Sequence, residues 1–169
     1  MTDTTEKLAK AYNQMLETTK EIIDMTKREG TPAIQFALDE AKEKVAEATE
    51  LTGEEIEKVS DFVMRDLRDA AEYIAVGERE LADWLRLDVL YIEDSLLDIF
   101  SHMVDETTLA LEDIRKKADE VGVWHTGEIA SIGTLVCKEC GEVLHFKKTG
   151  HIPPCPKCHH TEYRRNTRD

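Results

Sequence analysis

Apolar residues recur at helical spacing through residues 4–121. The strong helix breakers in this region are Gly30-Thr31-Pro32, Gly53 and Gly77. They divide it into about four segments in which apolar residues step by three or four positions. The first stripe comprises Leu8, Tyr12, Met15, Ile22 and Met25, and the most regular one comprises Ile56, Val59, Val63, Leu67, Ala70 and Ile74. The pattern predicts a mainly α fold, with an antiparallel helical bundle or coiled coil here.

Local signals mark where some of these helices begin and end. Thr52 and Glu55 have the spacing of a capping box, in which each side chain satisfies an unpaired backbone N–H at a helix start. Residues 78–121 contain neither Gly nor Pro. We therefore favour one continuous helix, about 66 Å long at ~1.5 Å per residue. The alternative is a break at residues 105–108, Asp-Glu-Thr-Thr, which cap helices well. Asp88 lies near the apolar stripe, and we expect it at the solvated edge.

The pattern changes near residue 122. Residues 142–148 alternate, so that Leu144 and Phe146 share one face, and residues 148–151 form a turn toward Ile152. This predicts a β-hairpin, with short strands added at residues 134–136 and 161–164. We therefore divide the chain into an acidic helical domain, residues 1–121, and a small β domain, residues 122–169.

The charges follow the same division. The chain has a net charge of -14, yet residues 122–169 hold 7 of the 22 Lys and Arg and only 5 of the 36 Asp and Glu. That part therefore carries +2 and residues 1–121 carry -16. The most apolar stretch, residues 81–104, is interrupted by charged residues, which argues against a membrane span. The opening residues lack the pattern of a secretory signal, so we expect a reducing, cytoplasmic location.

All four cysteines lie in the β part, as two C-x-x-C pairs separated by fourteen residues. They are Cys137, Cys140, Cys155 and Cys158. Two such turns can place four thiolates around one ion at ~2.3 Å, so the spacing predicts a structural zinc ion in a zinc ribbon. Rubredoxin-like iron is the alternative, since it uses the same two turns. Gly141 suits the left-handed conformation after the first pair, whereas His159 must adopt positive φ or bend the second turn differently.

The chain resembles the YbeL-like bacterial zinc-ribbon proteins over nearly its whole length. The resemblance lies in residues 122–165, which carry the two cysteine pairs, and in Asp66-Leu67, Trp84-Leu-Arg-Leu-Asp88 and residues 105–108. It implies that the four cysteines bind the metal, and the family has no assigned activity. His159 departs from the glycine expected at its position.

Our leading functional hypothesis is a non-enzymatic interaction protein. The sequence contains no nucleophile, base and oxyanion set, and four thiolates close a zinc site against substrate. Zinc would hold the ribbon as a platform, and the acidic helices would bind an unidentified protein partner or form a homo-oligomer.

The alternative is a nucleic-acid or RNA-polymerase-associated regulatory factor. Contacts would come from Lys147, Lys148, Lys157, Arg164 and Arg165, with Phe146 and Tyr163 as stacking groups. The architecture is similar to that of DksA-like factors, which act on RNA polymerase through a coiled coil. Against this hypothesis, a charge of +2 is weak and the acidic helices would repel a phosphate backbone.

Overall fold

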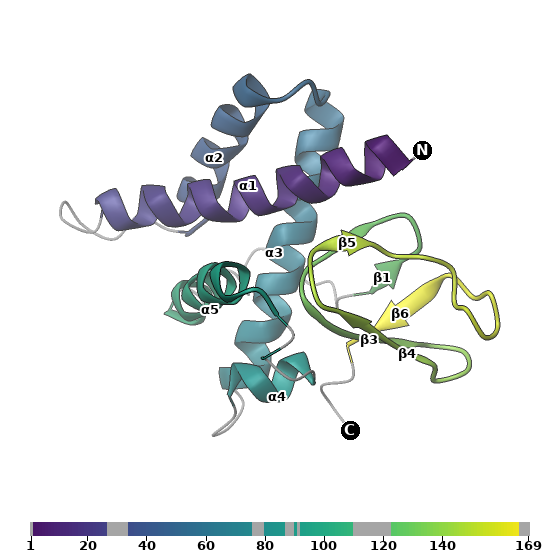
Figure 1. Ribbon diagram of the computed structural model, residues 1–169. Coiled ribbons are helices and arrows are strands. Elements are labelled where there is room, and N and C mark those ends of the chain that lie inside the picture. Colours follow the sequence, from purple (N-terminus) through teal and green to yellow (C-terminus); the bar gives the residue numbers. More distant parts are fainter. Residues whose placement is uncertain are drawn as a thin grey trace.

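The computed structural model describes residues 2–26, 34–75, 80–86, 90, 92–109 and 123–165. Helices make up the first part of the described chain and antiparallel strands the last part, which confirms the predicted fold class (Figure 1). The helices are α1 (Thr2–Thr26), α2 (Ile34–Ala48), α3 (Gly53–Ala75), α4 (Leu81–Leu85) and α5 (Asp94–Leu109). Within these residues, no helix has both the length and the hydropathy needed to cross a membrane.

The long helix α3 occupies the middle of the molecule, with α5 on one side and the β region on the other (Figure 1). It begins where the capping box was predicted, because the Glu55 N–H donates to the Thr52 hydroxyl at 3.1 Å. The predicted stripe of α3 is buried from Ile56 to Ala70. Helix α1 packs on α2 and crosses α3. Met25, at the end of its predicted stripe, is instead 66% exposed.

The prediction of one helix over residues 78–121 is wrong. Helix α4 ends at Leu85, because Arg86 adopts a left-handed conformation (φ 49°) and its N–H bonds back to the Ala82 carbonyl. The Leu85 carbonyl accepts a hydrogen bond of 2.7 Å from the Thr134 hydroxyl of the β region. The end of this helix is therefore stabilised by a residue far along the chain.

The alternative break at residues 105–108 is also wrong, because these residues lie inside α5. The Thr107 hydroxyl donates to the Met103 carbonyl at 2.7 Å, and the Thr108 hydroxyl donates to the Val104 carbonyl at 2.9 Å. These side chains bond within the helix that they were expected to interrupt. Asp88 and the end of the predicted long helix, after Leu109, lie outside the described residues, as does the proposed domain boundary at 121–122.

The strands form two antiparallel sheets. The larger has the order β1-β6-β3-β4 and the smaller pairs β2 with β5. The strands are β1 (Trp124–His125), β2 (Ile129–Ala130), β3 (Gly133–Cys137), β4 (Val143–Phe146), β5 (Gly150–His151) and β6 (Glu162–Arg164).

Strand β4 was predicted, but its partner was not. It pairs with β3, with Leu144 opposite Leu135, so the hairpin closes around the first cysteine pair. The predicted hairpin with the segment near Ile152 does not form, because β5 pairs with β2 in the other sheet. The expected alternation in β4 is present: Leu144 and Phe146 are half-buried.

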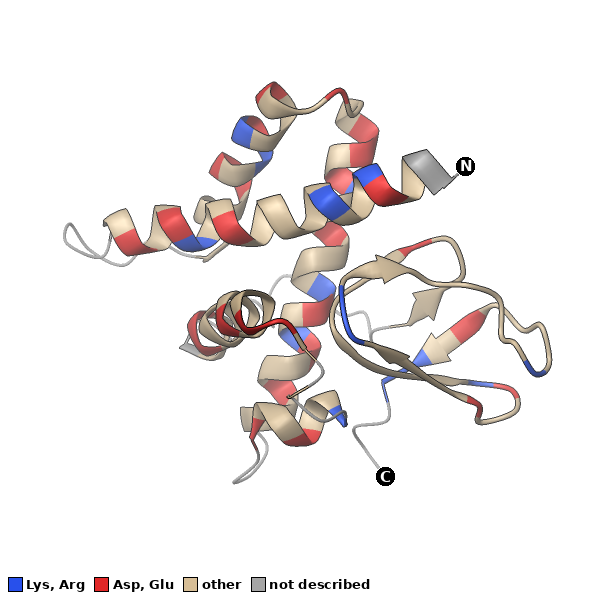
Figure 2. Cartoon of the chain, viewed as in Figure 1, with Lys and Arg blue, Asp and Glu red and all other residues tan. Residues whose placement is uncertain are grey.

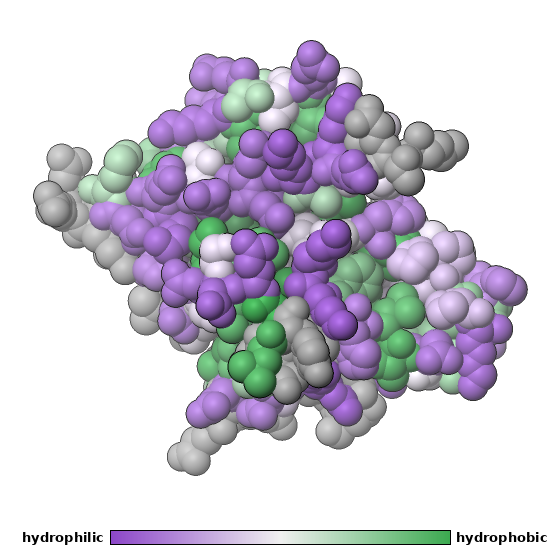
Figure 3. All heavy atoms as spheres, in the orientation of Figure 1, coloured by the Kyte–Doolittle hydropathy of each residue, from purple (hydrophilic) through white to green (hydrophobic). Residues whose placement is uncertain are grey.

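The β region shares the apolar core of the helices. Ile129 and Ile132 belong to the same buried cluster as the apolar residues of α1, α2, α3 and α5. A second and smaller cluster lies inside the β region; its buried members are Trp124, Ala130, Leu135, Cys137, Ile152, Cys155 and Tyr163. Hydrophilic side chains cover most of the face seen in Figure 3, and smaller hydrophobic areas appear among them over both the helices and the β region.

Candidate metal centre

The four predicted ligands converge within the β region. Their sulfur atoms all lie within 4.8 Å of one another. The Cys137 and Cys158 sulfurs are 3.6 Å apart, and the Cys140 and Cys155 sulfurs are 3.5 Å apart. Sulfurs arranged as a tetrahedron at ~2.3 Å from one ion would be ~3.8 Å apart, whereas a disulfide holds its sulfurs ~2 Å apart. The spacing therefore fits four thiolates around a metal ion.

The two C-x-x-C turns have matching backbone geometry. In the first, the Gly141 N–H donates to the Cys137 carbonyl at 3.0 Å, and in the second the His159 N–H donates to the Cys155 carbonyl at 2.9 Å. Gly141 has φ 78° and His159 has φ 65°. His159 thus adopts the left-handed conformation that the sequence predicted as one of two outcomes, and it does so with a Cβ that disfavours it.

Backbone N–H groups favour the ionised form of the thiols, whereas burial and the closeness of the four thiols oppose their joint ionisation. Burial raises the pKa of the Cys155 thiol, but the N–H groups of Cys158 and Lys157, helped by neighbouring thiols, lower it to about 6. At Cys158 the His160 N–H lowers the pKa, yet burial and the three other cysteines outweigh it and raise the pKa to about 12. Four sulfurs this close therefore ionise together only with a cation between them, which is what a metal ion supplies.

Tyr163 forms a wall of the cysteine site. It is fully buried, and its hydroxyl donates to the Pro153 carbonyl at 2.7 Å. Burial and the surrounding cysteines raise its pKa to about 12. The structure thus corrects its expected role as a stacking group for nucleic acid, because its ring has no exposed face.

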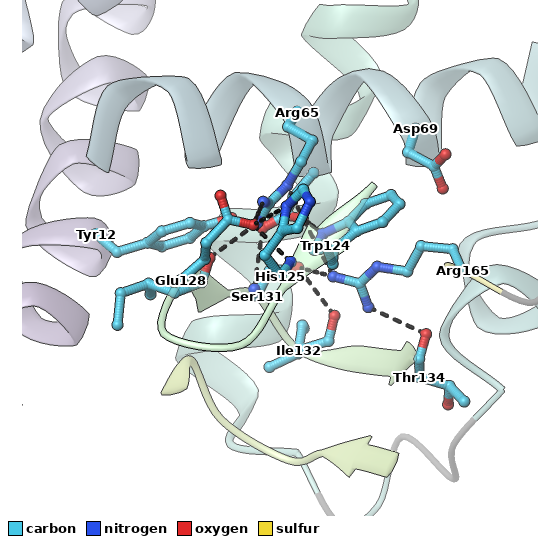
Figure 4. Close-up of polar contacts among 12 residues, drawn as sticks. Tyr12, Arg65, Asp69, Trp124, His125, Glu128, Ser131, Ile132, Thr134 and Arg165 are labelled. Atoms are coloured by element: carbon cyan, nitrogen blue, oxygen red, sulfur yellow. Dashed lines mark hydrogen bonds and ion pairs between the residues drawn. The ribbon is translucent and has the colours of Figure 1, made fainter. Parts of the chain in front are cut away.

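A second arrangement, which the sequence analysis missed, joins the helices to the β region around Asp66 of α3. Figure 4 shows its partners Tyr12, Arg65, Trp124 and Arg165, which come together from helices and strands. Asp66 is fully buried and accepts hydrogen bonds from the Tyr12 hydroxyl (2.7 Å) and the Trp124 indole (2.7 Å). The Arg165 guanidinium lies 3.2 Å from the same carboxylate, and Arg65 lies 3.4 Å from it. We call these five residues the Asp66 cluster.

Two arginines compensate the negative charge of Asp66 in this cluster, and aromatic rings contact the arginines. Burial alone would raise the pKa of Asp66, but Arg65 and Arg165, with the hydrogen bonds from Tyr12 and Trp124, hold it below its usual value. Arg165 lies over the Trp84 ring, 4.5 Å from its centroid. The carboxylate is therefore ionised and its charge is compensated.

Arg65 and the backbone extend these contacts along the β region. The Arg65 side chain donates to the Glu128 carboxylate at 3.1 Å and to the Ile129 carbonyl at 2.9 Å. The Ser131 backbone N–H donates to the Asp66 carboxylate at 3.0 Å. The cluster thus joins α3 to both side chains and backbone groups of the β region.

The sequence contained a signal for this cluster. Asp66 lies three residues after Val63 and four before Ala70, and so it shares the buried face of α3. A carboxylate on the buried face of a helix requires a charged or hydrogen-bonding partner. The sequence analysis noted Asp88 near an apolar stripe and expected it at the solvated edge, but it assigned no buried role to Asp66.

The predicted basic contact residues differ in their exposure. Lys147, Lys148 and Lys157 are exposed and Arg164 is half-buried. The structure corrects the placement of Arg165, which is 4% exposed and paired with Asp66. Figure 2 shows scattered basic residues on the β region, beside helices that are rich in acidic residues.

The helical fold and the four-cysteine β region define a zinc-ribbon protein, and comparison with known families agrees. The chain belongs to the family described as "Zinc-ribbon containing domain", whose model matches residues 20–167. It is 29% identical to "Uncharacterized protein YbeL" of Escherichia coli strain K12 over 159 residues, or 94% of this chain and 96% of that protein. The YbeL proteins of E. coli O6:H1 (strain CFT073) and O157:H7 give the same values. These matches confirm the predicted resemblance, and no solved structure matches the chain.

Proposed function

We propose that this protein is a non-enzymatic interaction protein, in which one structural zinc ion holds the β region in shape. The observation that carries the proposal is the set of four converging cysteine sulfurs. Four protein thiolates fill a tetrahedral site and leave no position for a water or substrate. A site of this kind supports structure and not hydrolysis.

Zinc is favoured over iron by the family description, which names a zinc ribbon. A tetrahedron of four thiolates can hold either ion, and zinc, which has no redox chemistry, suits a closed site with a structural role. Because thiolates must stay reduced to bind the ion, we further propose a reducing location such as the cytoplasm. Elemental analysis and a visible spectrum of the purified protein test the metal. A red, iron-loaded protein would disprove the zinc assignment.

The helices are the proposed surface for a protein partner or for self-association. Their outward faces carry most of the acidic residues, and a partner with basic residues would complement them (Figure 2). Affinity purification from cells can compare the full-length protein with Cys155→Ser, which removes a ligand. His159→Gly is the control, because it alters the same turn and keeps all four ligands.

Loss of a partner with Cys155→Ser, but not with His159→Gly, would show that binding requires the metal-held fold. Reversal of an exposed charge on α2, Glu43→Lys, keeps all four ligands, so weaker binding by this variant would assign the contact to the helices. The proposal would be overturned by a specific catalytic activity that one substitution abolishes while metal and fold stay intact.

A role in nucleic-acid or RNA-polymerase binding is the second candidate. The supporting observation is that Lys147 and Lys148 are exposed directly after Phe146, which is half-buried at the end of β4. A base could stack on such a ring while the ammonium groups contact phosphates. Filter binding and polymerase pull-down at low salt test this candidate, with Lys147→Gln/Lys148→Gln as the variant. No retention of either target would eliminate it.

A further inference from the structure

The β region contains little apolar core of its own. Its own buried cluster is small, and two of its members, Cys137 and Cys155, are metal ligands. Cores of this size require a metal or another crosslink. Metal binding at the four cysteines therefore supplies much of the folding free energy of the β region.

Strand β3, which ends at Cys137, and the strands beside it lead to the residues that face α3. Strand β3 begins at Gly133, next to the segment that bonds Asp66, and ends at Cys137. Cys137 pairs with Tyr163 of β6, and Arg165 follows that strand directly. Trp124 of β1 pairs with Tyr163 as well. Ordering the cysteine turns thus fixes the strands that place Trp124 and Arg165 against Asp66.

The helices depend on these contacts for a complete core. Ile129 and Ile132 belong to the apolar cluster of the helical bundle, and Thr134 binds the carbonyl at the end of α4. Tyr12 of α1 reaches Asp66 of α3 inside the same junction. At another point, the Thr149 hydroxyl donates to the Asn13 side chain of α1 at 2.6 Å. Loss of the β region would therefore remove contacts from α1, α3 and α4 together.

We propose that metal binding at the cysteine site stabilises the helical bundle through the Asp66 cluster, so that metal loss loosens the helices as well as the β region. The protein then folds as one metal-dependent unit, although its sequence divides into two parts. A partner that binds the helices would thereby respond to the metal state of a distant site. This inference rests on the metal site of the proposed function and goes beyond it.

The test compares thermal unfolding of the full-length protein with its metal and after chelation, with helix content followed by far-ultraviolet circular dichroism. In the unaltered protein, chelation should lower the helix-melting midpoint by about 10 °C. In Arg165→Met, which removes the charged link from β6, this shift should fall to about half or less. Trp124→Phe, which removes the indole hydrogen bond from β1 to Asp66, gives a second variant of the junction if Arg165→Met folds poorly, and it should also reduce the shift.

Val45→Ala is the matched control. Val45 is buried in α2, which packs on α1 and α3, so its truncation destabilises the bundle without touching the Asp66 cluster. Its melting midpoint should be lower with and without metal, and the difference caused by chelation should equal that of the unaltered protein. If chelation changes the melting midpoint of Val45→Ala as little as that of Arg165→Met, the proposed coupling through the Asp66 cluster is overturned.

Tryptophan fluorescence gives a second measurement, because the chain has two tryptophans and both contact Arg165. Chelation should move the emission of Trp84 and Trp124 to longer wavelength together with the loss of helix signal. Metal content is measured on every sample. A chain that holds no metal would disprove the metal site and the coupling with it, whereas a metal-loaded chain whose helices melt at the same temperature after chelation would disprove the coupling alone.

Discussion

Removal of the negative charge of Asp66 is the substitution with the largest expected effect on stability. Asp66→Asn keeps the shape of the side chain but leaves Arg65 and Arg165 without their shared buried counter-charge. Breaking a buried ion pair by removing one partner typically costs about 3–5 kcal/mol. The amide nitrogen would also face the donors of Tyr12 or Trp124, and so at least one hydrogen bond is lost.

The expected decrease of about 3–5 kcal/mol in the free energy of unfolding is measured by urea denaturation, and it corresponds to a melting temperature lower by ~10 °C for a chain of this length. Asp61→Asn is the matched control on the same helix. Burial and the neighbouring Glu57 raise the pKa of Asp61, so its negative charge does not stabilise the fold and its removal should cost nothing. A decrease below about 1 kcal/mol for Asp66→Asn would refute the view that this carboxylate joins the helices to the β region.

Three further substitutions or conditions test separate contacts. Gly133→Ala should destabilise the protein by about 1–3 kcal/mol, because Gly133 has φ 129° and an added Cβ would lie 2.7 Å from the Arg165 guanidinium. Gly53→Ala is the control, since the space around Gly53 is open and no loss is expected. The melting temperatures of the two variants are compared with that of the unaltered protein. Because the pKa of Asp66 is lower in the folded than in the unfolded protein, its contribution is complete above about pH 4 and is lost as the pH falls through the folded pKa. Urea titrations across that range should show an acid loss that is smaller in Asp66→Asn, and equal losses would contradict the assignment. His159→Gly should retain the metal, and its free energy of unfolding should rise by up to about 1 kcal/mol, because glycine adopts φ 65° without strain. Loss of metal in elemental analysis would show that the imidazole has another role.

The features that the sequence predicted correctly depend on residues close together in the chain. The start of α3 follows from the Thr52 hydroxyl and an N–H three residues away, and its buried stripe follows from the helical period. The cysteine site was predicted because two short turns with fixed spacing present thiolates in the same way in any context. The left-handed Gly141 belongs to the same local geometry.

The sequence predictions that failed depend on contacts between distant residues. The end of α4 is stabilised by Thr134, which lies 49 residues after Leu85. Strand β4 has the same alternation whichever neighbour it pairs with, so the pattern alone did not select β3 over the segment near Ile152. Such choices are decided by which surfaces meet in the folded chain.

The sequence by itself determined the class of this protein: acidic helices, a small β region and four cysteines spaced for one metal ion. Only the tertiary structure revealed that Asp66 joins the two parts, because its partners Tyr12, Trp124 and Arg165 lie 54, 58 and 99 residues away. Local spacing fixes which backbone elements form and which ligands share a turn. A buried charge, by contrast, is stable only where packing brings its counter-charges to it, and that depends on the whole fold.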